Sequence, residues 1–599
     1  MSVSDQENLV LANRLQESLA GSDLPPQFAK LYSQHTRVSA NRPGLHSWGP
    51  SEARQRLDDS VRLLEAGFIQ RGADHENYTS SMRRAAELLE WLAHPRLNPD
   101  ELPLNLLASA VYQLAGYPAR SSGLLREDAS TVAESPILKT FLRADFPSLV
   151  LNLCEYWAGS GQVAGTYKQV EPENKNDTGN WVEYQVVAET ASCLGVLSAV
   201  LRWGEDPRLP KTLEKLKALS GWLLHHSEPY SWLLSKLCTE VAAHYVRRAL
   251  RPLVTGLLGT MGADGQIAME RYLRQAYLGK KSIVWPSQAT GIERLGVGRS
   301  FALCTPTGSG KTTIAELGIL QSLFSPDLNL DPTTEPLAPL TLYLVPSRAL
   351  AAEVESKLAR VLRRVSDQRI IVTGLYGGTD WGPTDAWLTS EERTVLICTY
   401  EKAEALMRFL GPLFLERVRL IVLDEAHLVQ FDGQEDALRT ADHRGLRLES
   451  LGMRLFSHVE GGRCRVIGLS AVATGMGRAL AGWVTGNESE APLMSSYRST
   501  RQLIGRLACL PNRSFEIHYD LLDGASLQFR GGGPSDTPYI PSPFPPHPPL
   551  QQWGNGPLQI ARPYLLWPPC NLLRLTTRDG SGVSSFRSQR RLAITPTIS

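Results

Sequence analysis

Residues 301–315, with the sequence FALCTPTGSGKTTIA, combine the residue types of a phosphate-binding loop. A short apolar run ends in Gly and Thr residues and resumes as a predicted helix. Because glycine has no Cβ, the backbone N–H groups of such a turn can approach an anion closely. Lys311 would contact the β- and γ-phosphates of a nucleotide, while Thr312 would offer its hydroxyl to Mg²⁺ at a helix start, where the dipole favours anions. The alternative is a glycine-rich turn that binds no ligand.

The residues of this loop that we expect to contact the nucleotide are Thr307, Gly308, Ser309, Gly310, Lys311, Thr312 and Thr313. The general pattern GxxxxGK[ST] has Gly where this chain has Thr305, so its strict form is not met.

Two carboxylates follow a second apolar run in LIVLDEAH, residues 420–427. Beside a phosphate-binding loop, this negative charge becomes favourable only with a divalent cation. We therefore expect Asp424 to hold Mg²⁺ and Glu425 to polarise the attacking water as a general base. Alone, a strand followed by Asp-Glu is more often a helix start with Asp as N-cap, and it is the loop that favours the nucleotide interpretation.

The elements that position these residues are short apolar runs that alternate with helical stretches between about Arg299 and Ala471. Continuous apolar strands separated by helices indicate a parallel sheet in a doubly wound α/β domain, whose ligands lie at the carboxyl ends of the strands. The runs that we expect to be strands are Phe301–Cys304, Leu340–Val345, Ile370–Thr373, Val395–Cys398, Leu420–Leu423 and Val466–Leu469.

Before this domain, residues 1–278 have helical periodicity, clearest in Ser60–Phe68, Met82–Leu92, Leu104–Leu114 and Leu213–Leu224. Residues 103–125 predict a helical hairpin broken at Gly116. An irregular all-α bundle fits better than a repeat array, because no period is found. Tryptophans in this region are expected in the core rather than as base-stacking platforms: Trp157, Trp181, Trp203, Trp222 and Trp232.

Composition sets the broad class. A chain of 599 residues predicts two to four domains, and 62 basic against 61 acidic residues give no overall attraction for nucleic acid, so any groove must be local. The eight cysteines include no CxxC pair, which predicts buried thiols in a reducing cytoplasm. Without a signal-like start or a membrane-length apolar run, we expect a soluble, cytoplasmic protein with no membrane partner.

The motifs TPTGSGKTT and LDEAH resemble motifs I and II of the DEAD/DEAH-box helicases of superfamily 2, and the resemblance covers about residues 283–483. It implies a RecA-like P-loop domain that binds ATP, Mg²⁺ and either DNA or RNA. Together WPSQ, PTGSGKT, PSRAL and DEAH look closest to superkiller-type helicases. Bacterial members of that type, including helicase subunits of anti-phage systems, also have long helical N-terminal regions.

The same resemblance assigns roles to further residues. Gln288 matches the glutamine that reads adenine, and His427 joins Lys311, Asp424 and Glu425 as catalytic. Ser470 and Ala471 match motif III, which couples hydrolysis to nucleic-acid binding, although Val472 replaces its threonine. The residues that match nucleic-acid-contacting motifs are Arg348, Gly377, Gly378, Thr399 and Lys402.

The segment after residue 495 departs from a helicase of this superfamily, which has a second RecA-like domain. Gln502–Arg506 mimics motif VI but follows motif III too soon, so we interpret it as part of a connector. Ser514–Tyr519 fits a first strand, after which the Pro-rich run from Pro538 is expected to block both helix and sheet. The remainder is a truncated or frameshifted end, or a disordered tail.

We therefore expect three regions: a helical region at 1–278, a RecA-like ATP-binding domain at 279–495, and a connector with a stump of a second RecA-like domain at 496–599. The expected function is that of the ATP-binding half of an ATP-dependent DNA or RNA helicase, poorly active alone. Two alternatives remain: a nucleotide-gated nucleic-acid-binding module without motor activity, and a helical scaffold subunit of a multi-protein complex, including one for anti-phage defence. In the last case a protein partner would bind the helical region.

Overall fold

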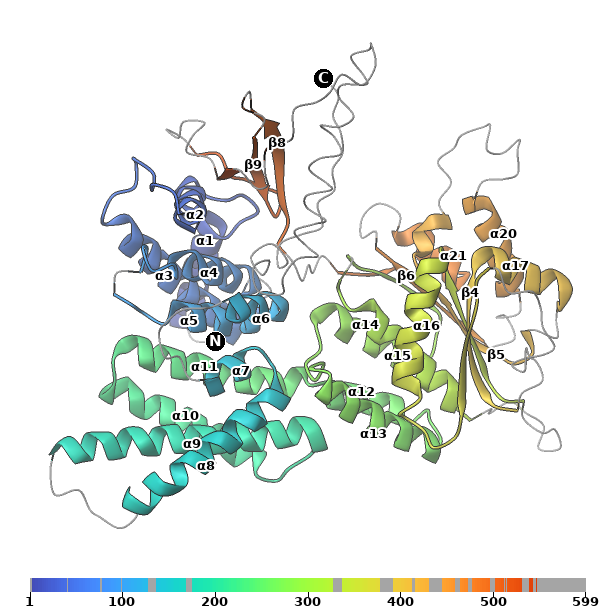
Figure 1. Ribbon diagram of the computed structural model, residues 1–599, viewed down its shortest axis with the longest axis horizontal. Coiled ribbons are helices and arrows are strands. Elements are labelled where there is room, and N and C mark those ends of the chain that lie inside the picture. Colours follow the sequence, from blue (N-terminus) through green and yellow to red (C-terminus); the bar gives the residue numbers. More distant parts are fainter. Residues whose placement is uncertain are drawn as a thin grey trace. The chain divides into compact units, whose positions relative to one another are not determined.

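The structure of the protein is a computed structural model, drawn in Figure 1. It describes residues 3–39, 41–75, 78–98, 100–127, 136–167, 175–306, 308–326, 337–377, 391–411, 415–429, 444–457, 464–471, 477–495, 501–510, 512, 514–529, 538–541 and 546. Contacts divide the chain into two compact units. Unit 1 comprises Met1–Gly195, Pro210–His244 and Ser499–Ser599, and unit 2 comprises Val196–Leu209 and Tyr245–Arg498.

Within the described part of unit 2, seven strands form one sheet in the order β3-β4-β2-β5-β6-β1-β7, and all paired neighbours run parallel. The strands are β1 Phe301–Cys304, β2 Leu340–Val345, β3 Ile370–Leu375, β4 Arg393–Thr399, β5 Val418–Leu423, β6 Arg465–Ser470 and β7 Leu493–Met494. The six apolar runs predicted as strands lie in β1 to β6, and the predicted α/β class with a doubly wound parallel sheet is confirmed.

Helices cover both faces of this sheet, as Figure 1 shows. Because successive residues of a strand point to opposite faces, Tyr343 of β2 packs in one core and Leu344 in the other. The first core includes α12 to α16, and the second includes α17, α20 and α21. These helices are α12 Leu250–Leu258, α13 Ala263–Leu278, α14 Pro286–Val297, α15 Lys311–Phe324, α16 Arg348–Leu362, α17 Tyr400–Phe409, α20 Arg444–Phe456 and α21 Gly477–Thr485, with a short 3₁₀ helix η1 at Ala426–Val429.

Helices α12 and α13, which we predicted from the sequence to belong to the N-terminal helical region, share a core with the sheet. Their apolar residues include Val254, Leu257, Met269 and Tyr272, all buried. Helical periodicity alone cannot tell which neighbour a helix packs against, because it reports only that one face is apolar. The region boundaries at 278/279 and 495/496 stay predictions.

Unit 1 is mainly helical in its described part, which confirms the large all-α N-terminal region. Its helices are α1 Val3–Leu19, α2 Pro26–Ser39, α3 Glu52–Gly72, α4 Tyr78–Leu92, α5 Leu104–Leu114, α6 Pro118–Glu127, α7 Pro136–Leu142, α8 Phe146–Tyr167, α10 Leu209–His226 and most of α11 Pro229–Arg248. Helix α9, Lys175–Trp203, belongs to unit 1 up to Gly195. The predicted hairpin is confirmed as α5 and α6, and Gly116 at its break has φ 81°.

A small antiparallel sheet completes unit 1. It contains β8 Leu503–Cys509, β9 Phe515–Leu522, β10 Ala525–Ser526 and β11 Tyr539–Pro541, and the first, third and fourth of these all pair with β9. Leu503–Arg506 lies in β8, and the interpretation of Gln502–Arg506 as part of a connector stays a prediction. The Pro-rich run does not block pairing at its start, because Pro541 lies in β11, an edge strand of this sheet, where proline is tolerated.

The described part of this C-terminal segment belongs to unit 1. Residues 531–533 and most of the Pro-rich run lie outside the described residues. The stump of a second RecA-like domain at 496–599 therefore stays a prediction.

Buried ion pairs join the helices of unit 1 to this sheet. Arg501 donates from both terminal nitrogens to Glu90 of α4, at 2.9 and 2.7 Å. Arg120 of α6 contacts Glu87 of α4 at 2.9 Å and Asp523, after β9, at 2.7 Å. The two arginines are buried and the carboxylates of Glu90 and Asp523 are partly buried, so removing a carboxylate leaves a buried charge uncompensated.

Several tryptophans and one cysteine depart from the predicted burial. Trp157, Trp203 and Trp222 are 44%, 55% and 39% exposed, so the expectation that they fill the core is wrong. The guanidinium groups of Arg202 and Arg274 instead lie over the Trp203 ring, 4.6 and 4.9 Å from its centroid. Cys154 is exposed rather than buried.

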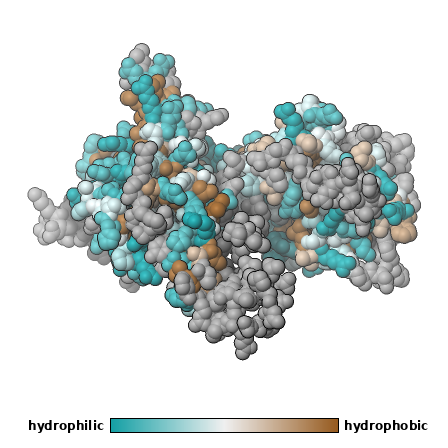
Figure 2. Space-filling model, turned by 90° about the horizontal axis from the view of Figure 1, so that it is seen from above, coloured by the Kyte–Doolittle hydropathy of each residue, from teal (hydrophilic) through white to brown (hydrophobic). Residues whose placement is uncertain are grey.

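Among the described residues, one helical segment, Tyr184–Trp203, has the length and apolar composition to cross a membrane, and 39% of that window is buried in the protein. Such a segment is also typical of a core helix. On the face drawn in Figure 2, hydrophobic residues are interspersed with hydrophilic ones. Cytoplasmic localisation stays a prediction.

Candidate active site

The loop between β1 and α15 forms a closed turn at the carboxyl edge of the sheet. Gly308 and Gly310 have φ of 82° and 86°, a conformation that favours glycine, and Gly310 is the residue before the first turn of α15. The hydroxyls of Thr305 and Ser309 lie 2.7 Å apart and close the turn. Thr307 lies outside the described residues. The loop thus leads into a helix N-terminus, where free N–H groups favour an anion.

Helix α14 fastens this loop from the side. Ser287 donates its hydroxyl to the carbonyl of Ser309 at 2.8 Å, and Gln288 Nε2 donates to Gly310 O at 3.3 Å and Thr313 Oγ1 at 3.2 Å. Gln288 Oε1 in turn accepts from the backbone N–H of Trp285 at 2.9 Å. The structure therefore brings Gln288 to the loop, where it holds the backbone, while contact with adenine stays a prediction. The sequence analysis did not identify Ser287 as a residue that contacts the loop, although it precedes Gln288 in WPSQ.

Lys311 is the first residue of α15, and its ammonium donates to the carbonyl of Thr305 at 3.1 Å. Burial lowers the pKa of Lys311, while the nearby carboxylates of Glu425 and Asp424 act to raise it. The loop lysine and the carboxylate pair, far apart in sequence, therefore lie within electrostatic reach of each other. Thr312, the predicted Mg²⁺ ligand, has an exposed side chain at the second position of α15.

Asp424 follows the last residue of β5, and hydrogen bonds hold its backbone and its carboxylate, including one from its own N–H to Leu344 O at 2.9 Å. Its Oδ2 accepts from the Tyr343 hydroxyl at 3.1 Å, its Oδ1 accepts from the Glu425 N–H at 3.0 Å, and its carbonyl accepts from the Tyr400 hydroxyl. Burial raises the pKa of Asp424, the Glu425 carboxylate raises it further, and the Tyr343 bond opposes both. Sequence reasoning missed both tyrosines, although a Tyr inside an apolar strand usually has a hydrogen-bond partner.

Glu425 adopts φ 53°, a left-handed backbone that is costly for a residue other than glycine. Its Oε2 is buried and accepts no hydrogen bond from the described residues, and Nδ1 of His427 lies 3.4 Å away. Strained backbone and unsatisfied buried acceptors concentrate at functional sites. An ordinary helix N-cap would need neither feature, so the geometry favours the nucleotide interpretation of this Asp-Glu pair.

Strand β6 separates β1 from β5 and ends in Ser470. The carbonyl of Ser470 accepts from the backbone N–H of Thr305 at 3.1 Å, so the end of β6 contacts the start of the loop. Ala471 follows it, while residues 472–476, with the departure from the motif, lie outside the described residues. A coupling role for Ser470 and Ala471 stays a prediction, although their position between loop and carboxylates suits it.

The predicted nucleic-acid contacts follow the neighbouring strands β2, β4 and β3. Arg348 begins α16 after β2, and it lies so close to Gly377 after β3 that a Cβ there would be 2.4 Å from its Cζ. Thr399 ends β4 and is 6% exposed, and Lys402 follows in α17 with a half-buried side chain. Gly378 lies outside the described residues. The four described residues therefore share the carboxyl edge with the loop.

A parallel sheet with this loop and this carboxylate pair at its carboxyl edge defines a P-loop nucleotide-binding domain. Residues 285–475 match the model of the DEAD/DEAH box helicase family. The resemblance drawn from the motifs is confirmed.

Similar proteins extend the comparison. The chain is 27% identical over 451 residues to Hachiman protein HamB of Bacillus cereus, covering 74% of this chain and 36% of that protein. It is 35% identical over 178 residues to the DExH-box ATP-dependent RNA helicase DExH12 of Arabidopsis thaliana, covering 29% of this chain and 7% of that one. Among solved structures, Mycobacterium smegmatis helicase Lhr bound to ssDNA and AMP-PNP has 24% identity and a TM-score of 0.28, covering 39% and 27% of the respective chains.

Proposed function

We propose that this chain contains the ATP-binding domain of an ATP-dependent DNA or RNA helicase. The observation that carries the proposal is the position of Lys311, which the loop places beside the Asp424–Glu425 pair at the carboxyl edge. The helicase family of residues 285–475 supports it. In this arrangement ATP lies at the ends of β1, β6 and β5, and nucleic acid lies at the ends of β2, β4 and β3.

Each residue then has a separate task. Lys311 leaves Thr305 O to bind the β- and γ-phosphates, and the N–H groups at the start of α15 bind the rest of the phosphate chain. Asp424, oriented by Tyr343, helps to hold Mg²⁺, which when bound offsets the charge of the phosphates. Glu425 takes the proton of the attacking water through its unpaired Oε2.

The residues present fit Mg²⁺–ATP better than a metal alone. Among the described residues no group of three or more His, Cys, Asp or Glu side chains gathers around one point. A cation at Asp424 must therefore complete its ligands with oxygens from phosphates, water and Thr312, which is how protein-bound Mg²⁺ is usually held. Such a cation would favour the ionised carboxylate of Asp424, whose pKa is raised by burial, and would offset the charge of Glu425, whose Oε2 accepts no hydrogen bond from the described residues.

A second candidate is a helical scaffold in which the ATP-binding domain serves assembly with a protein partner. The observation that favours it is the match to HamB, because its alignment of 451 residues extends far beyond the 285–475 segment. The exposed Trp203, which contacts two arginines, adds a surface suited to a partner, because Trp and Arg are enriched at interface hot spots.

ATP hydrolysis by the full chain, measured with and without DNA or RNA, tests the proposal, with Lys311→Ala as the inactive control. A helicase shows hydrolysis that nucleic acid stimulates and the variant lacks. Binding of ATP and nucleic acid without stimulated hydrolysis indicates the nucleotide-gated module instead. ATP binding without affinity for either nucleic acid contradicts the proposal and favours the scaffold.

A further inference from the structure

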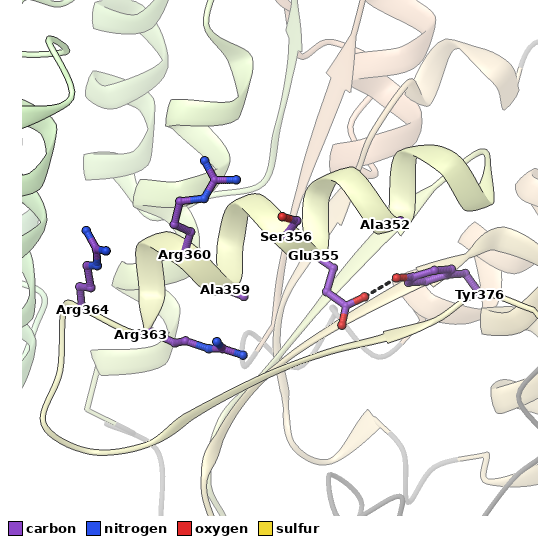
Figure 3. Close-up of a pocket in the computed structure, with 8 residues that line it drawn as sticks. All are labelled: Ala352, Glu355, Ser356, Ala359, Arg360, Arg363, Arg364 and Tyr376. Atoms are coloured by element: carbon purple, nitrogen blue, oxygen red, sulfur yellow. Dashed lines mark hydrogen bonds between the residues drawn. The ribbon is translucent and has the colours of Figure 1, made fainter.

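A groove with a volume of about 550 Å³ lies along the outer face of α16, next to the edge strand β3. Figure 3 shows that three arginines gather at the C-terminal end of the helix, while Tyr376 lies at the other end and donates its hydroxyl to Glu355. The residues that line the groove are Ala352, Glu355, Ser356, Ala359, Arg360, Arg363, Arg364 and Tyr376. Several of these are small, so an extended chain can lie close to the helix backbone.

The three arginines carry charge that the described protein leaves unpaired. Arg360 lies in the last turn of α16, and Arg363 and Arg364 follow the helix directly, so the spacing of three and four places all three around one end. All are exposed. No described residue forms an ion pair with them, whereas Lys357 on the same helix is paired with Glu353. In a chain of net charge +1, such a cluster is a local feature rather than a result of composition.

The other end of the groove meets the predicted phosphate-binding edge. Tyr376 precedes Gly377, which touches Arg348 at the start of α16. A helix of 15 residues is about 22 Å long, at about 1.5 Å per residue. The groove therefore begins where Arg348 would hold a strand and leads along the helix to the arginines at its far end. Basic residues also stabilise the C-terminus of a helix, but that effect is confined to the last turn. It therefore does not explain why a groove leads from Arg348 to these arginines.

We propose that a single strand of nucleic acid, leaving the carboxyl edge, continues along this face of α16 and that Arg360, Arg363 and Arg364 bind its phosphates. This inference rests on the proposed function, because it extends the same nucleic-acid path. Arginine forks match phosphate oxygens, and a strand with one charge per nucleotide supplies partners at the required intervals. An acidic protein segment is the competing occupant, and it lacks this continuity with Arg348.

The experiment measures binding of labelled oligothymidine and oligouridine to the full chain by fluorescence anisotropy at several salt concentrations. The test variant carries Arg360→Gln, Arg363→Gln and Arg364→Gln together. A charge-matched control carries Lys211→Gln, Lys217→Gln and Arg299→Gln, three exposed cations outside the groove. A third variant has lysine at all three arginine positions and keeps the charge. Circular dichroism and ATP-analogue binding confirm that each variant is folded.

The expected effect depends on the length of the oligonucleotide. Each phosphate contact to a single strand contributes about 0.7 to the slope of log K against log salt, so losing three lowers the slope by about 2 and weakens binding about 100-fold near 0.1 M salt. A strand of about 20 nucleotides should show this loss, while one of about 3, too short to reach from Arg348 to the three arginines, should show much less. The control should bind like the parent, and the lysine variant should recover most of the loss.

The outcomes separate the two proposals. If the parent binds neither oligonucleotide, the proposed function and this inference fail together. If the parent binds both and the glutamine variant loses nothing with the longer strand, the path along α16 is refuted while the function stands. If an acidic peptide such as polyglutamate requires the three arginines and the oligonucleotides do not, the groove is a protein-docking site instead.

Discussion

Replacing Gly310 with alanine tests whether the loop depends on a close approach between its backbone and Gln288. A Cβ at Gly310 would lie 2.2 Å from Nε2 and 2.7 Å from Cδ of Gln288, and the residue has φ 86°. Gly298, at the end of α14, is the matched control. It has φ 75°, and a Cβ there meets nothing within 4 Å.

The two substitutions share one cost and differ in another. Holding alanine in a left-handed conformation costs about 1–2 kcal/mol at either position. At Gly310 the Gln288 amide must also move, which breaks its bonds to Gly310 O and Thr313 Oγ1. At about 0.5–1.5 kcal/mol for each bond, this adds about 1–3 kcal/mol. We therefore expect a loss of about 1–2 kcal/mol for Gly298→Ala and about 2–5 kcal/mol for Gly310→Ala.

Thermal unfolding and ATP-analogue binding measure the difference. At about 2–4 °C per kcal/mol for a unit of this size, Gly298→Ala should lower Tm by about 2–8 °C and Gly310→Ala by about 4–20 °C. Only Gly310→Ala should weaken nucleotide binding. Gln288→Ala should add little to Gly310→Ala, because both remove the same bonds. Equal losses at the two glycines, or additive losses for Gly310→Ala and Gln288→Ala, would refute the reasoning.

Three other predictions concern charged groups. Lys311→Ala removes a charge-assisted phosphate contact of about 1.5–3 kcal/mol and should weaken a fluorescent ATP analogue about tenfold to a hundredfold; unchanged affinity would exclude this loop as the site. Glu425→Gln keeps the shape and removes the base, so it should retain Mg²⁺–ATP and abolish hydrolysis, and parental turnover would contradict that role. Burial alone would raise the pKa of Glu87. The surrounding arginines, of which Arg84 has the largest effect, outweigh burial and lower the pKa of Glu87 to about 2. Since that pKa lies below its usual value, Glu87 contributes about 3 kcal/mol above about pH 4.5, and this is lost as pH falls toward 2. Urea unfolding of Glu87→Gln should show lower stability at pH 7 and a weaker loss in acid, and a pH dependence like that of the parent would count against the network.

The sequence carried much information about the sheet and its carboxyl edge. Apolar runs long enough for one strand and bounded by loops predict buried parallel strands, so β1 and β2 were predicted with the bounds that they have. Lys311, Asp424 and Glu425 follow strands, and the carboxyl ends of parallel strands meet at one edge, which is why their proximity was predictable.

Contacts between distant segments were not predictable from pattern. Tyr343 and Tyr400 orient Asp424 across strands, and nothing in either local sequence names that partner. The tryptophans show a related limit. Trp203 has a helical position typical of core, yet two arginines hold it at the surface, and a guanidinium partner 71 positions away along the chain leaves no local signal.

The ion pair between Arg501 and Glu90 has a consequence for synthesis of the chain. Its partners are 411 positions apart, and all of unit 2 is encoded between them. At about 5–20 residues per second, about 20–80 s pass on the ribosome between the appearance of Glu90 and that of Arg501. During that interval α4 has emerged, but Arg501, which neutralises its Glu90, has not. The surface of unit 1 that later packs against the small sheet is then exposed to other nascent chains. Synthesis of unit 1 therefore starts before that of unit 2 and ends after it. We expect the folding of unit 1 to depend on chaperones more than that of unit 2, whose described strands all emerge in one continuous stretch.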